Sequence, residues 1–339
     1  EAGLQRVACT EVYHARILRG NRYYSATKLG AFGSDLGAIA CFFEIPWTRV
    51  SFALTETWPT WLMNEAATRL RGLGRLSESL EAMECGLEMR SQDLDLRSKA
   101  RCVCNLSELK LTLGAVDEAI DHGRQSVGLS DKASDLFMRI VSRTVLGYAL
   151  LAACRHSEAE VEFLAAEKLQ SATDASFPQL YSVQRFWYCE FLFSKAEKSF
   201  LSSKGLVKPN ELMAICNRAE KLIEAANYFP DAPLLDLALG HLALGRGRLF
   251  SINTRIRTSN GGFELPDNPE FQSLLSAADF HIETAVASLY RAGTSHWFPS
   301  ALLTRSWVRS LKGNHIGAES SKSDLDEAWE IAERGPMKL

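Results

Sequence analysis

A unit of helix, tight turn and helix recurs in this chain at a spacing of 40 residues, and such a repeat sharply limits the possible folds. The three copies of the turn are LGRLSES (73–79), LGAVDEA (113–119) and ACRHSEA (153–159). Each copy lies between two apolar runs of helical period. A single unit cannot bury its apolar face alone, so neighbouring units must stack. The sequence therefore predicts an all-α fold, a right-handed α-α superhelix of antiparallel helix pairs.

The turn shows related chemistry in each copy. One shared position just past the first helix holds Gly74, Gly114 and Cys154. Glycine suits this position because the chain there needs a left-handed conformation. We expect the second helix to be capped by a side-chain oxygen that accepts from free backbone N–H groups, in Ser77, Asp117 and Ser157.

The third copy has a distinctive order of small and large residues. Leu146 and Gly147 lie on its first helix, and the second carries Ala159, Phe163 and Ala166. This order resembles the tetratricopeptide repeat, although that repeat usually spans about 34 residues. The other two copies match it less well, with Ser79, Met83 and Gly86, then Ala119, Gly123 and Ser126. The resemblance implies a tetratricopeptide-like α-solenoid.

The rest of the chain is expected to be helical but less regular, with no strands. Predicted helices cover 180–200, 211–227, 233–253, 276–291, 298–312 and 323–334, with loops near 204–210 and 258–269. We divide the chain into residues 1–55, a helical lead-in packed on the solenoid, and residues 56–339, about six helix pairs that become irregular after 180.

The lead-in contains LGAFGSDLGAIACFF (29–43), whose glycines allow two interpretations. Gly30, Gly33 and Gly37 could share one face of a helix that packs closely on a neighbour. Alternatively Gly33 ends one helix and Ser34 caps the next, which avoids most of the cost of glycine in a helix and is preferred. Close packing predicts that Gly37→Leu destabilises the N-terminal helices.

Three long strings resemble the C-terminal repeat region of bacterial STAND ATPases, the signal-transduction NTPases with NACHT or AP-ATPase modules. They are residues 11–47, residues 64–76 and residues 324–337. The resemblance implies a sensor or partner-binding scaffold that follows an NTPase module. It also implies that the chain is truncated at both ends, with the nucleotide machinery upstream and a further helix downstream.

Patterns for known catalytic chemistry do not occur. There is no G-x-x-x-x-G-K-[ST], G-x-S-x-G or H-E-x-x-H, so we expect no enzyme activity and no cofactor. The net charge of −3 argues against nucleic acid. The eight cysteines form no C-x-x-C pair and are expected to be small buried hydrophobic residues in a reducing cytosol. No apolar run reaches ~20 residues, so no membrane span is expected.

Three weaker patterns have ordinary interpretations. Glu11 and His14 form one E-x-x-H, and without a second copy a surface pair fits better than a di-iron site. The aromatic run 181–193 suits a core better than a ligand wall. The basic residues Arg246, Arg248, Arg255 and Arg257 suit a solvated face better than an acidic partner's docking site.

In tetratricopeptide arrays the first helix of each pair lines the concave groove. By that resemblance the groove here would show Cys104 and the candidate binding residues Asn64, Thr68, Arg71, Arg101, Glu108, Thr144 and Tyr148. The lysine–asparagine clamp that some relatives use for peptide C-termini is not matched, and Glu108 would repel a carboxylate.

Three functions therefore compete. The first is a non-catalytic cytoplasmic domain that binds a protein or peptide and regulates an attached NTPase. The second is a small-molecule sensor with a pocket near the aromatic helix. The third and most remote is an unrecognised helical enzyme.

Overall fold

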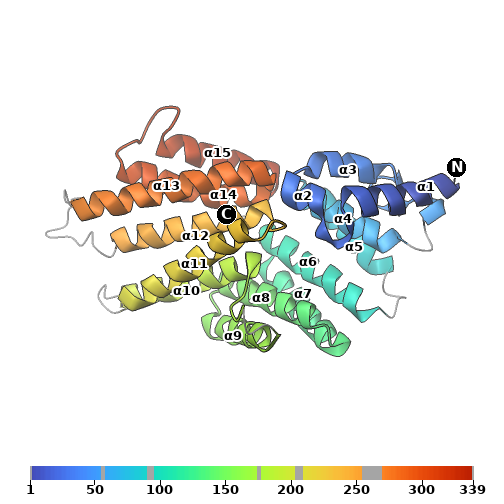
Figure 1. The fold of residues 1–339 in the computed structure, drawn as a ribbon, viewed down its shortest axis with the longest axis horizontal. Coiled ribbons are helices and arrows are strands. Elements are labelled where there is room, and N and C mark those ends of the chain that lie inside the picture. Colours follow the sequence, from blue (N-terminus) through green and yellow to red (C-terminus); the bar gives the residue numbers. More distant parts are fainter. Residues whose placement is uncertain are drawn as a thin grey trace. The chain divides into compact units, whose positions relative to one another are not determined.

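A computed structural model describes residues 2–54, 58–89, 95–173, 177–202, 209–253 and 269–337. The described chain is almost entirely helical, and successive helices pack as antiparallel pairs, as in an α-solenoid (Figure 1). The all-α prediction is confirmed, while the right-handed sense of the superhelix stays a prediction. The chain forms two compact units. Unit 1 is Glu1–Leu180, Arg291–His296 and Ile331–Leu339, and unit 2 is Tyr181–Tyr290 and Trp297–Glu330.

Unit 1 begins with short elements that precede the repeats. They are α1 (Ala2–Val7), the π-helix η1 (Ala8–Ile17), η2 (Gly20–Arg22), α2 (Tyr24–Leu29), α3 (Phe32–Ala40), β1 (Phe43–Ile45), β2 (Arg49–Val50) and η3 (Phe52–Leu54). Strands β1 and β2 form a small antiparallel hairpin, which corrects the expectation of no strands. Each strand is too short to show a two-residue alternation in the sequence.

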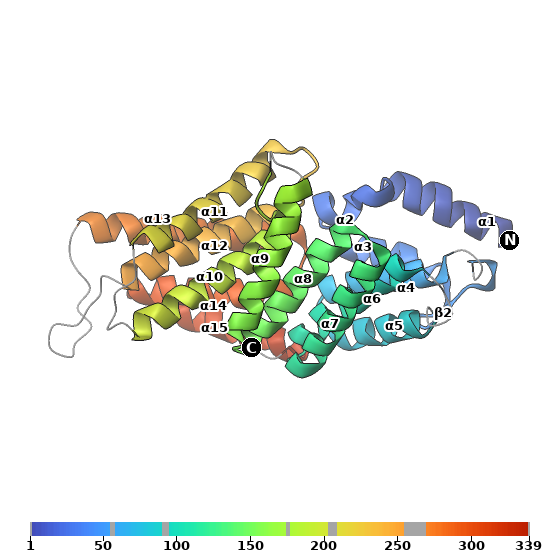
Figure 2. The ribbon, with the colours of Figure 1, turned by 90° about the horizontal axis from the view of Figure 1, so that it is seen from below.

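Three helix pairs follow these elements in unit 1. They are α4 (Pro59–Gly72) with α5 (Leu76–Met89), α6 (Leu96–Thr112) with α7 (Val116–Ala133), and α8 (Leu136–Ala152) with α9 (His156–Thr173). The first helix of each pair also contacts the first helix of the next, and Figure 2 shows α6 and α8 side by side. The row α4, α6, α8 is therefore one surface of the stack.

The predicted turn conformation is confirmed in all three copies. Gly74, Gly114 and Cys154 have φ angles of 77°, 75° and 59°, all in the left-handed region. Cysteine has a Cβ that disfavours this region, so the third turn carries a backbone strain that the other two avoid.

The predicted caps are wrong, because each second helix begins one residue before the expected serine or aspartate. Ser77, Asp117 and Ser157 therefore lie inside their helices. Side-chain capping occurs at the first helices instead, where Asp95 accepts from the backbone N–H of Ser98 and Asp135 from that of Met138. Asp95 and Asp135 are themselves 40 residues apart (135 − 95), so the caps follow the repeat.

The two helices of a pair approach closely where small residues meet. In the first pair the Ser79 hydroxyl donates to the Ala67 carbonyl oxygen at 2.7 Å. In the second pair the roles are exchanged, and the Ser107 hydroxyl donates to the Ala119 carbonyl oxygen at 2.6 Å. In the third pair a Cβ on Gly147 would lie 3.0 Å from the Phe163 ring. The small-residue positions inferred from the sequence are thus the contact points of the pairs.

Unit 2 contains longer helices around an aromatic core. They are α10 (Ser182–Ser202), α11 (Pro209–Tyr228), α12 (Leu234–Asn253), α13 (Pro269–Ala292), α14 (Phe298–Leu311) and α15 (Ser321–Arg334). The predicted helices are confirmed to within a few residues, except that α13 begins earlier. The predicted loops at 204–210 and 258–269 lie largely outside the described residues. The α10 aromatic residues are buried, which confirms their role in the core: Phe186, Trp187, Tyr188, Phe191 and Phe193.

A buried ion network joins the lead-in to the first repeat. Arg69 on α4 contacts Glu65 at 2.6 Å and Asp35 of α3 at 3.4 Å, and all three side chains are about 3% exposed. The Ser25 hydroxyl donates to Asp35 at 2.8 Å. Burial raises the pKa of Glu65 despite the neighbouring guanidinium. Removal of one partner from such a network leaves an unpaired buried charge, which typically costs about 3–5 kcal/mol.

The glycine-rich stretch is a joint between helices, but at a different glycine from the one expected. Gly30 ends α2 in the left-handed conformation, and α3 begins at Phe32. A Cβ on Gly30 would lie 2.2 Å from the Arg291 carbonyl oxygen, whereas nothing lies within 4 Å of one on Gly33 or Gly37. Both earlier interpretations are therefore wrong in detail, and no close packing is present at Gly37.

The cysteines only partly match their prediction. Cys9, Cys102, Cys104, Cys189 and Cys216 are buried, but Cys41 and Cys154 are exposed and Cys85 is intermediate; all eight are free thiols. Among the described helices, none combines the length and apolar character that a membrane crossing requires.

We predict opposite effects for alanine at two glycines of the same stretch. Gly30→Ala should lower the free energy of unfolding by at least about 1–2 kcal/mol, because the left-handed backbone and the Arg291 carbonyl both exclude a Cβ. Gly37→Ala, on the exposed side of α3, should raise it by up to about 1 kcal/mol. Urea denaturation of both variants measures this, and an unchanged Gly30→Ala would contradict the packing described.

Candidate functional site

The candidate site is the surface formed by α4, α6 and α8 of unit 1, which we term the first-helix surface. Two contacts between α4 and α6 organise it, a pair of asparagine side chains and an ion pair. The Asn105 side-chain amide donates to the Asn64 side-chain oxygen at 2.8 Å. One turn further along α4, the Thr68 hydroxyl donates to the Asn64 backbone carbonyl. The proton of the Thr68 hydroxyl is therefore already used within the helix. The two carboxamides thus form a pair that bridges consecutive repeats.

An ion pair lies at the other end of the same surface. Arg71 on α4 contacts Glu108 on α6 at 2.6 Å, with side-chain exposures of 16% and 19%. The pair is accessible enough to meet a ligand, yet its two charges neutralise each other. A free carboxylate would find no unpaired cation at this position, which agrees with the missing carboxylate clamp.

The other predicted residues divide between the surface and the core. Arg101 is exposed and Tyr148 is half-buried, but Thr144 is fully buried and donates its hydroxyl to the Val141 carbonyl. Cys104 follows Asn64 by one 40-residue repeat and was therefore expected on the surface, but it is also buried. The predicted surface role is therefore wrong for Thr144 and for Cys104.

Asn105 is the surface residue that the sequence reasoning missed. Helix α6 is rotated so that Asn105, rather than its neighbour Cys104, faces Asn64. The signal was present in the spacing, since Arg101, Asn105 and Glu108 fall at i, i+4 and i+7 on one helical face.

A histidine of unit 1 packs against the Arg71 end of the surface. His296 lies in the short 3-10 turn η5 (Ser295–Trp297) and hydrogen-bonds with the Arg71 backbone. Burial, together with the positive charge of Arg71, lowers the pKa of His296 to about 3. The ring is therefore neutral at physiological pH, and its site disfavours the imidazolium form.

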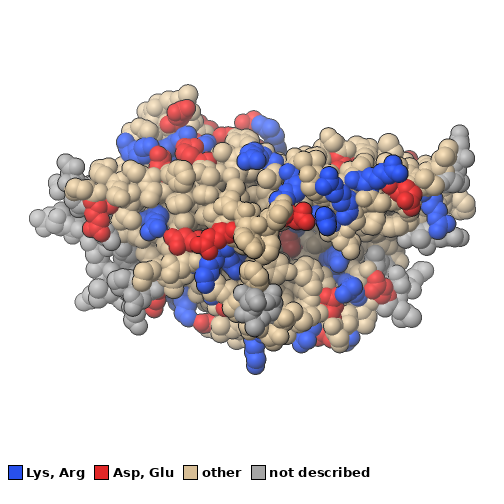
Figure 3. All heavy atoms as spheres, viewed as in Figure 1, with Lys and Arg blue, Asp and Glu red and all other residues tan. Residues whose placement is uncertain are grey.

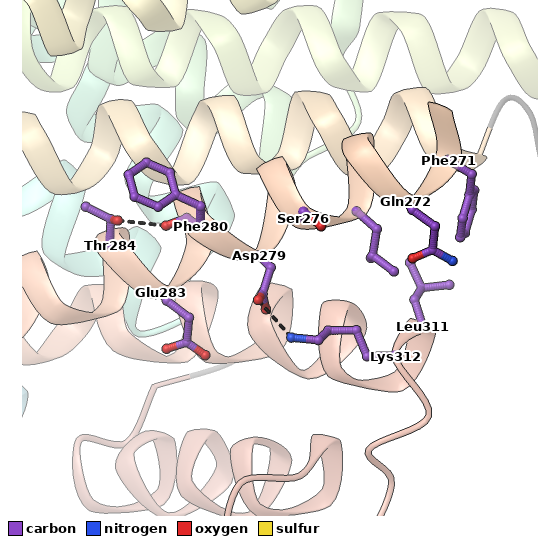
Figure 4. Close-up of a pocket in the computed structure, with 10 residues that line it drawn as sticks. Phe271, Gln272, Ser276, Asp279, Phe280, Glu283, Thr284, Leu311 and Lys312 are labelled. Atoms are coloured by element: carbon purple, nitrogen blue, oxygen red, sulfur yellow. Dashed lines mark hydrogen bonds and ion pairs between the residues drawn. The ribbon is translucent and has the colours of Figure 1, made fainter. Parts of the chain in front are cut away.

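Unit 2 has a separate pocket of about 650 Å³ along α13, which is also lined by Leu311 at the end of α14 and by Lys312, the residue that follows it. Figure 4 shows the Asp279–Lys312 ion pair, which spans 2.8 Å, and, at the apolar end of the pocket, Phe271 and Leu311. Leu275 also lines the pocket. The pocket lies on α13 and α14, so it is not formed by the aromatic helix that the sequence suggested for a small-molecule site.

Two of the four basic residues from 246 to 257 have structural roles. Arg246 pairs with Glu190 and also donates to Ser300 and Thr304, and Arg248 pairs with Glu220 at 3.5 Å. Residues 255 and 257 lie outside the described part of the chain. Ion pairs inside unit 2, rather than solvation or an acidic partner, account for the two described arginines.

The two residues of the E-x-x-H pattern have different surroundings. His14 packs against the rings of Trp58 and Trp61, with both centroid distances at 5.5 Å, while Glu11 is exposed. No group of three or more possible metal ligands occurs among the described histidines, cysteines and carboxylates.

The lead-in has a basic surface that the sequence reasoning did not single out. Figure 3 shows Lys and Arg gathered over the region of α1 to α3. Residues 4–30 contain five basic side chains and one acidic side chain, Glu11; the basic ones are Arg6, Arg16, Arg19, Arg22 and Lys28. This surface suits a negatively charged neighbour.

Comparison with known proteins adds no assignment: the chain matches no protein-family model and no curated protein.

The environment of His296 predicts how stability depends on pH. Between about pH 6.5 and 3 the unfolded chain binds a proton at this ring and the folded chain does not. Stability should therefore fall as the pH drops through that range, by up to about 1.4 kcal/mol per pH unit. In His296→Gln the free energy of unfolding should fall less steeply with decreasing pH, by up to about 1.4 kcal/mol per pH unit, because the unfolded chain no longer binds a proton at this position. Urea denaturation at pH 7, 6 and 5 measures this difference. Parallel declines for variant and parent would show that folding does not lower the pKa of His296.

Proposed function

We propose that this chain is a non-catalytic, tetratricopeptide-like repeat domain that binds a protein or peptide on its first-helix surface. The helix pairs stack so that the first helices of successive pairs adjoin, which creates an extended surface from several repeats. The resemblance of residues 11–47, 64–76 and 324–337 to STAND proteins supports a sensing role within a larger, cytoplasmic bacterial ATPase.

The pairing of Asn64 with Asn105 carries this proposal. A carboxamide offers both donors and an acceptor, so the pair can exchange its mutual hydrogen bond for bonds to a peptide backbone. Arg71 and Glu108 add charges of both signs. Because they neutralise each other, we infer an internal peptide segment as the ligand, rather than a free C-terminus.

Selection of linear peptides from a random phage-displayed library against the full chain tests the proposal. We expect enriched peptides that bind the parent and lose at least tenfold affinity for Asn105→Ala, since that variant removes the bridging amide. Gln125→Ala removes an exposed amide from the second helix α7 and should leave binding unchanged. Peptides that bind both variants as tightly as the parent would contradict the choice of surface.

The same preparation should show no ATP turnover above background. Turnover that one point substitution in this chain abolishes would overturn the non-catalytic assignment.

The pocket along α13 supports a second candidate, a small-molecule sensor. Its apolar end and the Asp279–Lys312 pair together suit a small zwitterion with an apolar side group. A thermal-shift screen of apolar amino acids would test it. A stabilising ligand should lose its effect in Ser276→Trp, which fills the pocket, but keep it in Ser273→Trp, an exposed α13 position that does not line the pocket. Equal responses of the two variants would exclude this pocket.

A further inference from the structure

Four polar side chains follow one face of α6 along the first-helix surface. At spacings of four, four and three residues, they are Arg97, Arg101, Asn105 and Glu108. Three of the four bond to another part of the stack. Asn105 and Glu108 reach α4, as described above, and Arg97 pairs with Asp135, the residue that caps α8. These three side chains hold neighbouring repeats together.

The fourth side chain, Arg101, has no such role. It is exposed, and within the described part of the chain it makes no hydrogen bond and no ion pair. Its positive charge acts on Glu65 and Asp135, but each of these carboxylates already pairs with another arginine, Arg69 and Arg97 respectively. The guanidinium of Arg101 is therefore available to a ligand.

The equivalent positions on the neighbouring first helices are apolar. Trp61 on α4 precedes Arg101 by one 40-residue repeat, and Val141 on α8 follows it by one repeat. One turn before Val141, the side chain of Phe137 is 52% exposed. Apolar side chains on both sides limit the access of water, so an ion pair formed at Arg101 would be stronger than one in open solvent.

The chemistry of a guanidinium determines what can bind it. Its planar N–H groups match the two oxygens of a carboxylate, which can accept two parallel hydrogen bonds. A cationic side chain would be repelled, and a neutral amide would bind more weakly. Because an internal peptide segment is the proposed ligand, the carboxylate belongs to an aspartate or glutamate side chain rather than to a chain end.

We propose that the peptide bound by the first-helix surface carries an aspartate or glutamate that pairs with Arg101, next to an apolar side chain that packs on Phe137. This inference rests on the proposed peptide-binding function and adds the chemical class of the ligand, an acidic and apolar segment. The Asn64–Asn105 pair lies one turn further along α6, where it meets the adjoining peptide backbone.

A double-mutant cycle between the full chain and its peptides tests the pairing. The probes are the phage-selected peptides, synthesised with their acidic residue and with the corresponding amide. We expect the amide form to bind the parent at least tenfold more weakly than the acidic form. On Arg101→Gln the two forms should bind equally, within twofold. Lys168→Gln removes an exposed cation from the second helix α9 and should keep the tenfold difference.

Charge reversal provides an independent measurement. Selection against Arg101→Glu should enrich lysine or arginine at the position where the parent selects an acidic residue. Arg101 is exposed and unpaired, so circular dichroism should show that both of its variants remain folded.

Two results would overturn the pairing: enriched peptides that share no acidic position, or an amide form that weakens binding to Arg101→Gln as much as to the parent. If those peptides still lose affinity for Asn105→Ala, the peptide site stands and only its acidic preference fails. Failure to enrich any peptide would overturn both proposals.

Discussion

The close approach of the two helices within each pair is the constraint on which unit 1 depends. Side chains at the contact must be small, and where serine replaces alanine its hydroxyl must find a partner in the apolar interior. Ser79 and Ser107 meet that need by donating to the carbonyl oxygen of the facing helix, at Ala67 and Ala119. Gly147 instead leaves room for the Phe163 ring. The three pairs thus achieve the same close helix packing with different residues. This packing positions the first helices, whose row forms the candidate surface.

The lead-in is attached to this stack by contacts of a different kind. The buried Arg69 links Asp35 of α3 to Glu65 of α4, so the first repeat and the lead-in share one charge network. Gly30 adds a close backbone contact with Arg291, far away in sequence but in the same compact unit. These contacts hold residues 1–54 in the same folded unit as the repeats, and basic side chains gather over the region of α1 to α3 (Figure 3).

Chemically different groups mark separate places along the described part of the chain. The first-helix surface pairs its own polar groups and suits a peptide backbone. The α13 pocket combines an apolar end with an ion pair. His241 and His281 share a hydrogen bond between their Nδ1 atoms, which are 2.9 Å apart. The first-helix surface and the α13 pocket carry groups that suit ligand binding, so binding is the function proposed for both.

The sequence by itself determined the helix pairs, their 40-residue period and the left-handed turn at Gly74, Gly114 and Cys154, because these depend on local periodicity and backbone conformation. It also placed Asn64, Arg71 and Glu108 on one surface. Helix rotation decided the rest: Asn105 rather than Cys104 faces Asn64, and Thr144 points into the core. Burial of Asp35 against Arg69, contact of Gly30 with Arg291 and the meeting of His241 with His281 also needed the tertiary structure. Each of these contacts joins segments that are far apart in the sequence, and a local sequence pattern cannot predict which distant residue will be the partner.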